Sequence, residues 1–202
     1  MGRIRIVSFF LLLVLVGGGV NGGNTAAANG EVGTPEYEDV FVQGNYAYCA
    51  ALYGGLDIID IRSIENPLKI GNYDTWTFER AAVYSVYVKG KYAYATYDEG
   101  LIIIDISNPV FPSPVGRYYT EINCLPMDVE VRDNYTYIVL GCGGLHVIDV
   151  TDPTSPTLKA KYITYWANGV YVKDNYAYVT DNQSGLMIFD VSDPSSLKLV
   201  GT

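Results

Sequence analysis

Residues 100–109, Gly-Leu-Ile-Ile-Ile-Asp-Ile-Ser-Asn-Pro, are the stretch that decides the fold of this 202-residue chain. Variants of the same phrase begin at Gly55, Gly144 and Gly185, so that the Gly-Leu pairs lie 45, 44 and 41 residues apart. Each is preceded by an aromatic couplet such as Tyr92-Ala93-Tyr94. A unit that recurs at this interval is typical of a small set of repeat folds, so the sequence predicts four repeats of one supersecondary unit.

Each repeat predicts an antiparallel sheet of four short strands. Runs rich in Val, Ile and Tyr alternate with turns of Gly, Asn, Asp and Pro, which are the residues that tight bends require. The run 101–106 is almost continuously apolar, as expected of a strand that is buried on both faces. In the last repeat the four strands are expected at 169–172, 176–180, 186–191 and 197–201.

The expected architecture follows from how such sheets can stack. A lone four-stranded sheet cannot bury two apolar faces, whereas sheets packed radially in a β-propeller bury both. No segment after residue 30 has a helical period with caps, so we predict an all-β chain. The first strand of each blade should line the channel, and inter-blade loops should share one face with the loops between second and third strands. The predicted four-stranded antiparallel blades are approximately 38–76, 82–120, 126–164 and 168–202.

Ring closure is left open by the sequence. The four blades are compatible with a four-bladed ring, with half of a dimeric ring, or with a fragment of a larger propeller. In an incomplete ring the first and last blades each expose an apolar face, so we expect self-association through these open terminal blades. The residues expected on the two faces are Val40, Val42 and Ile58 at one end, and Ile188 and Leu199 at the other.

The N-terminal residues have the pattern of a secretory signal peptide. A basic start at 1–5 is followed by the apolar stretch 6–16 and by small residues suited to cleavage after Ala28. The apolar stretch is shorter than the roughly 18–20 residues that a membrane span needs. We therefore expect a signal peptide at 1–28, a flexible spacer at 29–35, a secreted or cell-surface protein, and no membrane insertion after cleavage.

Charge and titratable residues exclude several functional classes. The chain has a formal net charge of −9 and no basic stripe, so no nucleic-acid partner is expected. The single histidine, His146, lacks a second histidine for a zinc site and is expected at a surface or packing position. An aspartate ends the third strand of every repeat, where it should bond to turn amides rather than to a metal. These aspartates are Asp60, Asp105, Asp149 and Asp190, and neither a metal nor another cofactor is expected.

Three cysteines are consistent with one disulfide in an exported protein. Cys124 lies in the loop that enters the third blade and Cys142 in a turn of that blade, on the same face of the predicted propeller. These two residues form the candidate disulfide. Cys49 falls within a second strand and is expected to be a small buried side chain with a free thiol.

The second repeat resembles the LVIVD repeat of bacterial and archaeal surface proteins. It carries the couplet 92–94, the Gly-Leu phrase quoted above and the downstream Val115-Gly116-Arg117-Tyr118. The first repeat is interpreted as departing from this pattern by an insertion between Asp60 and Pro67. The resemblance extends over about residues 36–202. It implies an exported β-propeller, often part of a larger surface protein, and it implies no catalytic activity because the motif residues are structural.

The irregular inter-blade loops carry large aromatics beside charged residues, which are the usual materials of a recognition surface. We therefore predict a non-enzymatic binding or assembly module at the cell surface, which contacts a protein or a glycan through the loop face. No catalytic residue is identified. The binding-face candidates are Trp76, Phe78, Arg80, Asp98, Glu99, Tyr119, Tyr165, Trp166 and Asp181.

The alternative function is an extracellular glycan-active enzyme of the propeller type. Hydrolysis of a glycosidic bond needs two carboxyl groups at a defined separation. Asp128 begins a channel-lining strand, but its counterparts Ser85 and Gly169 are not acids. A structure with two close, buried carboxylates near the channel mouth would favour the enzyme, and the absence of such a pair would favour binding.

Overall fold

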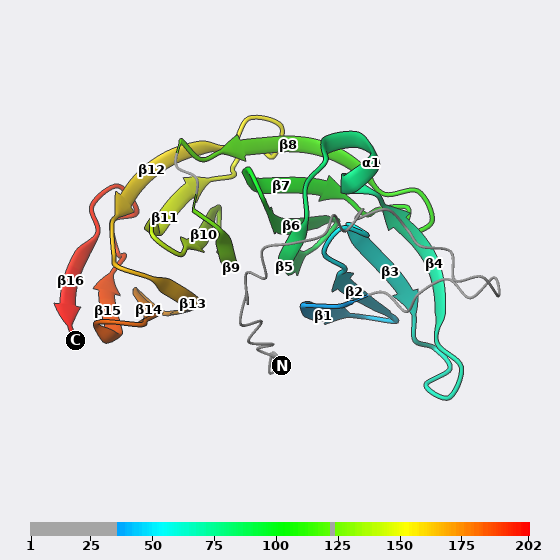
Figure 1. The fold of residues 1–202 in the computed structure, drawn as a ribbon, viewed down its shortest axis with the longest axis horizontal. Coiled ribbons are helices and arrows are strands. Elements are labelled where there is room, and N and C mark those ends of the chain that lie inside the picture. The colour runs from blue at the N-terminus through cyan, green and yellow to red at the C-terminus, as the bar shows by residue number, and fades with distance from the viewer. Residues whose placement is uncertain (1–35, 122–123) are drawn as a thin grey trace, which may run out of the picture.

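The computed structural model describes residues 36–121 and 124–202, and this part of the chain is almost entirely β-structure. Four four-stranded antiparallel sheets follow one another along the sequence, which confirms the all-β prediction. Figure 1 shows the sheets fanned as an arc, with the first strand of each on the inner side and the fourth on the outer side. The predicted signal peptide and spacer lie outside the described residues.

The strands of each sheet pair in the order in which they occur in the sequence. The first sheet contains β1 (Asp39–Gln43), β2 (Tyr46–Ala50), β3 (Leu56–Asp60) and β4 (Leu68–Tyr73). The second contains β5 (Val83–Lys89), β6 (Tyr92–Tyr97), β7 (Gly100–Asp105) and β8 (Ser113–Tyr119). The third contains β9 (Pro126–Arg132), β10 (Tyr135–Leu140), β11 (Gly144–Asp149) and β12 (Thr157–Tyr162). The fourth contains β13 (Ala167–Lys173), β14 (Tyr176–Asp181), β15 (Gly185–Asp190) and β16 (Lys198–Gly201).

The hydrophobic core lies between successive sheets rather than within any one of them. The leucines of the first three Gly-Leu pairs, Leu56, Leu101 and Leu145, point toward the following sheet and are fully buried there. Neighbouring positions on the same strands point toward the preceding sheet, as Ile102 and Ile104 of β7 do. The continuous apolar run of the third strand therefore serves two interfaces, one on each face of the sheet.

The glycine of the fourth strand has a packing role that explains its recurrence. A Cβ atom at Gly71 would overlap the carbonyl oxygen of Pro109, which belongs to the proline turn of the next sheet. Gly116 meets the carbonyl oxygen of Pro153 in the same way. A side chain at either position would push two sheets apart, so glycine permits the close approach of one backbone to another. Ala160 holds the equivalent position in the third sheet, opposite Val147.

The first repeat contains no insertion, so that interpretation was wrong. Gly71 pairs with Ile58 as Gly116 pairs with Ile103, and the interval from the strand-ending aspartate to this glycine is the same in both sheets. Ile64 therefore occupies the position held by Pro109 in the second repeat.

The prediction that Ile58 lies on the open face of the first sheet was also wrong, because its side chain is buried against the second sheet.

The aspartates that end the third strands bond to turn amides, as predicted. The Oδ1 atom of Asp60 accepts the amide of Arg62 at 3.0 Å, and that of Asp105 accepts the amide of Ser107 at 2.8 Å. Asp149 and Asp190 accept the amides of Thr151 and Ser192 in the same way, at 2.9 Å each. The role of these residues is therefore to hold the turn that follows the strand.

One short helix was missed by the sequence analysis. Helix α1 (Thr75–Glu79) occupies the loop between the first and second sheets. Asp74 caps it by accepting the amide of Thr77 at 2.9 Å, and Arg80 ends it in the left-handed conformation with φ of 57°.

Within the described part of the chain, no helix has the length and apolar character that a membrane span requires.

Replacing Ile104 by Asp should unfold the array. Ile104 is fully buried between the first two sheets, and an unpaired buried charge costs several kcal/mol against a typical net stability of about 5–15 kcal/mol. Loss of the β-sheet circular dichroism spectrum checks this expectation. The matched control, Val110→Asp, places the same charge at a 46% exposed position and should change the unfolding free energy by less than about 0.5 kcal/mol. A cooperatively folded Ile104→Asp variant would contradict the assigned core.

Candidate functional site

The loops between sheets and the loops between second and third strands form one hydrogen-bonded layer, which we call the loop face. Leu52 and Val83 form an isolated antiparallel bridge that joins a loop of the first sheet to the start of the second. The amide of Thr120 donates to the carbonyl of Glu99 at 2.8 Å, and the amide of Asn182 donates to that of Trp166 at 3.0 Å. These main-chain bonds fix the loops onto the sheets, so side chains on them are held in place.

An aromatic and cationic cluster lies on this face beside helix α1. Tyr53 packs edge-on against Trp76 with 4.9 Å between ring centroids, and the guanidinium of Arg80 lies 5.8 Å from the centre of the Trp76 ring. Tyr53 is 60% exposed, Trp76 is half-buried and Arg80 is exposed. We call these three residues the Trp76 cluster. Trp76 and Arg80 are among the predicted binding residues, whereas Tyr53 is not, although the Tyr-Gly-Gly turn of the first repeat carries it on the same face.

A second pair of exposed aromatic rings lies between the third and fourth sheets. Tyr165 is 66% exposed and Trp166 is 36% exposed. The Trp166 ring packs on Gly141, where a Cβ atom would lie 3.2 Å from the ring. A side chain at residue 141 would therefore press on the ring. The second and third sheets lie between this pair and the Trp76 cluster.

The other candidates on the loop face have mixed surroundings. Asp98 is exposed, yet its carboxylate accepts the Ala82 amide at 2.8 Å and the Tyr84 hydroxyl at 2.5 Å. Burial and this bond to Asp98 raise the pKa of Tyr84. Glu99 is exposed, and Tyr119 is 58% exposed at the end of β8. The backbone of Phe78 belongs to helix α1, but its side chain, like that of Glu79, lies outside the described part of the structure.

Asp181 holds a loop rather than facing solvent. It is buried, and its carboxylate accepts the amides of Trp166 at 2.7 Å, Gln183 at 3.0 Å and Ser184 at 2.8 Å. Burial by itself would raise the pKa of Asp181, but the bonds from these amides outweigh it and lower the pKa to about 2. Asp181 therefore fixes the backbone under the Trp166 ring and offers little surface to a ligand.

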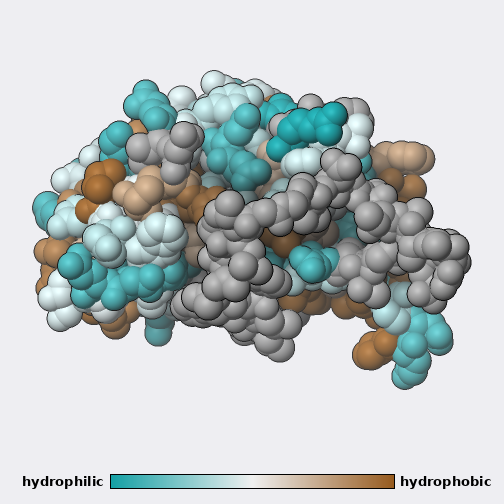
Figure 2. Space-filling model, in the orientation of Figure 1, coloured by the Kyte–Doolittle hydropathy of each residue, from teal (hydrophilic) through white to brown (hydrophobic). Residues whose placement is uncertain are grey.

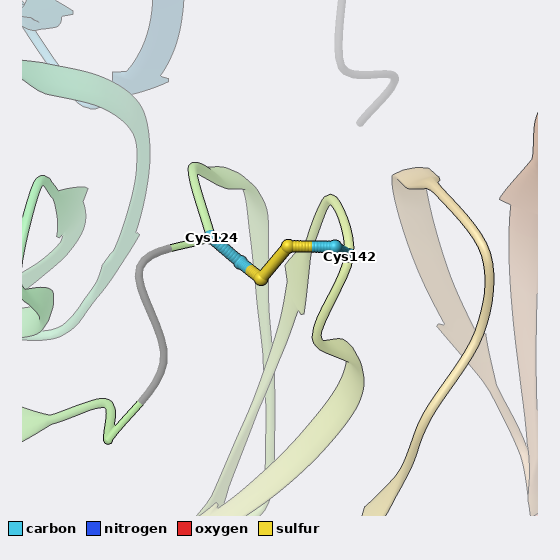
Figure 3. Close-up of a disulfide and its surroundings, with 2 residues drawn as sticks. All are labelled: Cys124 and Cys142. Atoms are coloured by element: carbon cyan, nitrogen blue, oxygen red, sulfur yellow. A yellow bond between two sulfur atoms is a disulfide. The ribbon is translucent and has the colours of Figure 1, made fainter.

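The structure joins Cys124 and Cys142 by a disulfide, with 5.4 Å between their Cα atoms. Figure 3 shows the bridge between neighbouring loops of the third sheet. It ties the loop that enters β9 to the loop between β10 and β11, next to Gly141 and the Trp166 ring. Cys49 is a free, buried thiol, and burial followed by the charges of Asp57 and Asp39 raises its pKa to about 11.

Two buried carboxylates do approach each other on the inner strands. The hydroxyl of Ser85 lies 2.7 Å from Oδ2 of Asp39 and 3.2 Å from Oδ1 of Asp128. Asp39, in the first sheet, is a counterpart of Asp128 that the sequence analysis missed. The two carboxylates are thus buried and linked through one hydroxyl, and the hydrogen-bond donors around each oxygen decide what the pair can do.

Each of these carboxylates also binds the backbone of the next sheet. Oδ2 of Asp39 accepts the amide of Val86 at 3.0 Å, and Oδ2 of Asp128 accepts that of Val170 at 2.6 Å. The remaining oxygens accept the amides of Val40 and Val129, at 2.9 Å and 2.8 Å. All four oxygens are thus engaged by protein donors in a buried layer. This arrangement clamps neighbouring sheets together, and it leaves little lone-pair capacity for proton transfer to a substrate.

His146 has a packing role, one of the two positions expected for it. It is buried between the second and third sheets, with Nδ1 3.0 Å from the hydroxyl of Tyr118. Burial, then the nearby charge of Lys161, lowers the pKa of His146 to about 4. Over residues 36–121 and 124–202, no three His, Cys, Asp or Glu side chains are arranged to hold a metal ion.

Comparison with known proteins identifies the repeat. The model of the LVIVD repeat matches residues 36–75, 82–120, 126–164 and 166–202. The chain belongs to the LVIVD repeat family. The four family matches coincide with the four sheets, so each LVIVD repeat corresponds to one sheet and its loops. No curated protein matches the sequence.

Two solved structures share the fold of this LVIVD-repeat chain. The computationally designed protein Ika8 superposes with a TM-score of 0.61 at 12% identity, over 78% of this chain and 46% of its own. The designed protein Ika4 superposes with a TM-score of 0.57 at 12% identity, over 75% of this chain and 88% of its own. The LVIVD chain thus spans less than half of Ika8 and most of Ika4. At this identity the likeness concerns the fold alone.

Removing the disulfide should destabilise the loop face. The bridge closes a loop with a sequence separation of 18 residues, for which the loss of chain entropy in the unfolded state predicts about 3 kcal/mol. Urea titration of the Cys124→Ser/Cys142→Ser variant measures this loss. Reductant should lower the stability of the parent protein and of Cys49→Ala, but not that of the double variant. Equal sensitivity of all three proteins to reductant would contradict the assignment.

Asp181 should give the fold a measurable acid sensitivity. Its pKa in the folded chain is about 2 against an ordinary value of 3.8, so its stabilisation is present above pH 3.8 and disappears as the pH falls through 2. One pKa unit corresponds to about 1.4 kcal/mol, and we expect a contribution of about 1–2 kcal/mol. The difference in unfolding free energy between the parent and Asp181→Asn should therefore shrink between pH 5 and pH 2. A difference independent of pH would show that the carboxylate charge is not involved.

Proposed function

We propose that this LVIVD-repeat chain is an exported, non-enzymatic binding module that holds a protein or a glycan at the cell surface through its loop face. The observation that carries the proposal is the Trp76 cluster, in which a 60% exposed tyrosine, a half-buried tryptophan and an exposed arginine are held together. Export is supported by the signal-peptide pattern of residues 1–28.

The Trp76 cluster has the chemistry of a binding hot spot. Tryptophan, tyrosine and arginine are the residue types that dominate binding energies at interfaces. Helix α1 is capped at both ends, and Thr75 donates from its hydroxyl to the carbonyl of Ala81 at 2.6 Å. The rings are therefore ordered before a ligand arrives, which reduces the entropy cost of binding. A flat ring beside hydrogen-bond donors suits both the apolar face of a sugar and an apolar side chain of a protein.

The enzyme alternative is the weaker one because of the inner carboxylates. Asp39 and Asp128 are close together, but their oxygens bind backbone amides of adjacent sheets. We propose that they hold the arc together, and that Asp128→Asn weakens the fold rather than a reaction. Screening the purified protein for glycan hydrolysis tests this: turnover that Asp128→Asn abolishes without loss of stability would support the enzyme instead.

Trp76→Ala should weaken binding by about 2 kcal/mol or more while leaving the fold intact. The measurement is retention of the labelled protein on producing cells and on a glycan array. Cells treated with periodate lose glycans, and cells treated with protease lose proteins, so the treatment that abolishes retention identifies the ligand class. Phe111→Ala is the matched control, because Phe111 is 76% exposed on the turn between β7 and β8. An equal loss of binding in Trp76→Ala and Phe111→Ala would contradict the proposal. So would a large fall in melting temperature for Trp76→Ala alone.

A further inference from the structure

We propose that a second copy of this chain docks head to tail, with its first sheet packed on the outer face of the last sheet of the first copy. The outer face of the last sheet is formed by β13 to β16 and is called the tail face; the face of the first sheet that points away from the second sheet is called the head face. Both lie apart from the loop face, so the proposal goes beyond the binding function proposed above.

The tail face is an unoccupied copy of an interface that the molecule forms three times. Leu186 is 49% exposed, whereas the leucines at the same register position in the other sheets are fully buried. Tyr178 is half-buried, whereas its counterparts Tyr94 and Tyr137 are 5% and 3% exposed. Tyr171 is 58% exposed beside Tyr178, its partner across the strands. The face therefore has the composition of an inter-sheet core without the neighbouring sheet.

The tail face also has an open position for the turn of a following sheet, at the glycine of its fourth strand, and we call this position the notch. Gly201 pairs with Ile188 as Gly116 pairs with Ile103, so it holds the position at which the glycine receives a carbonyl from the next sheet. The atoms nearest to a Cβ built at Gly201 belong to Ile188 of its own sheet, at 3.5 Å and beyond. The space in front of this glycine is thus free for the carbonyl oxygen of an incoming turn.

The head face presents a turn that matches this notch. Ile64 occupies the position of Pro109, and its turn is closed by the amide of Asn66 donating to the carbonyl of Ser63 at 3.3 Å. The equivalent bond from Phe111 in the second sheet measures 3.1 Å. Because the contact at the notch is made by a backbone carbonyl, an isoleucine in the turn can make this contact as well as a proline. Ile64 is 83% exposed, as expected of a turn that still lacks its partner.

The head face adds apolar surface around this turn. Val42 is 47% exposed, whereas Val88 and Val131 at the same register position are 3% and 4% exposed against the preceding sheet. Figure 1 shows the turn between β3 and β4 projecting from one end of the arc and the last sheet at the other. Figure 2 shows hydrophobic surface at both of these ends. The centre of the head face is polar, because Asp57 holds the register position of Ile102 and is buried there by bonds to Lys69, Tyr37 and Asn72. The apolar contact would therefore be made by Val42 and the turn around Ile64, and the two faces do not meet within one molecule.

A polar contact should form beside the apolar ones. At the end of β1, Nε2 of Gln43 donates to the carbonyl of Gly90 in the next sheet at 2.9 Å. At the end of β5, Nζ of Lys89 donates to the carbonyl of Asp133 at 2.7 Å. Lys173 is exposed at the same position of β13, and the corresponding carbonyl on the head face is that of Gly44. The second copy would supply this acceptor.

A head-to-tail contact is heterologous, since different surfaces of the two copies meet. Two identical arcs that meet at both junctions would form a closed ring in which no terminal sheet is left uncovered. Mass measurement of the full chain by light scattering during gel filtration should then give a dimer at micromolar concentration. A stable monomer at that concentration would overturn the proposal.

A mixing experiment separates head-to-tail docking from the alternatives. Leu186→Asp blocks the tail face, and Val42→Asp/Ile64→Asp blocks the head face; each change should raise the dimer dissociation constant at least about 30-fold. Neither variant should then dimerise alone, but an equimolar mixture should, because one molecule keeps an intact head and the other an intact tail. Phe111→Asp is the control outside both faces and should dimerise like the parent. Dimerisation of the head-blocked variant alone would show tail-to-tail contact and overturn the proposal.

Substitution of Gly201 tests the notch itself. Gly201→Val should leave the thermal unfolding of the chain unchanged under monomeric conditions, because no atom lies within 3.5 Å of the added Cβ. In the dimer the valine would collide with the Ile64 carbonyl of the second copy and lower the affinity at least about 10-fold. Gly201→Ala is the matched control and should have a smaller effect, since Ala160 occupies this position in the third sheet. Equal dimer affinity for glycine and valine would overturn the assigned docking geometry.

Discussion

Burial of apolar side chains between successive sheets is the interaction on which the rest of this structure depends. Each sheet is apolar on both faces, so none of them is stable by itself and each inner sheet needs two neighbours. Leu101 packs against the third sheet while Ile102, the next residue, packs against the first. The carboxylates of Asp39 and Asp128 add directional bonds between neighbouring inner strands. They fix the relative position of sheets that the apolar contacts already hold together.

The loop face derives its rigidity from this stack. Its loops differ in sequence and length, yet main-chain bonds such as the bridge between Leu52 and Val83 tie them to two sheets at once. The disulfide of Cys124 and Cys142 joins two loops of the third sheet to each other. Residues on these loops are therefore free to vary in type while their positions stay constant. This division of roles is the usual basis of recognition by a rigid scaffold with variable loops.

The sequence predicted the sheets well because their signals are local. Turn residues mark every strand end, and the Gly-Leu phrase places the third strand in each repeat. The face toward which a side chain points was harder to predict where both faces are apolar, and Ile58 was assigned to the wrong one. In the first repeat, Pro67 suggested an insertion because Ile64 holds the position of the usual proline. Asp39 was not predicted because its role depends on a contact with Val86, which is 47 residues away. Tyr53 was not predicted because its partner, Trp76, lies on a helix with few sequence signals.

The glycine notch has a consequence for how such chains change over evolutionary time. It restricts only the residue on one side of the junction to a small one, glycine or, in the third sheet, Ala160, because the other side contributes a main-chain atom that every amino acid possesses. Ile64 and Pro109 illustrate the freedom on that second side. When a repeat is duplicated, deleted or moved, the small residue of the preceding sheet can still receive the turn of the repeat that now follows it. That turn requires no compensating mutation. Arrays of this kind can lengthen or shorten by whole units while each junction keeps the same geometry.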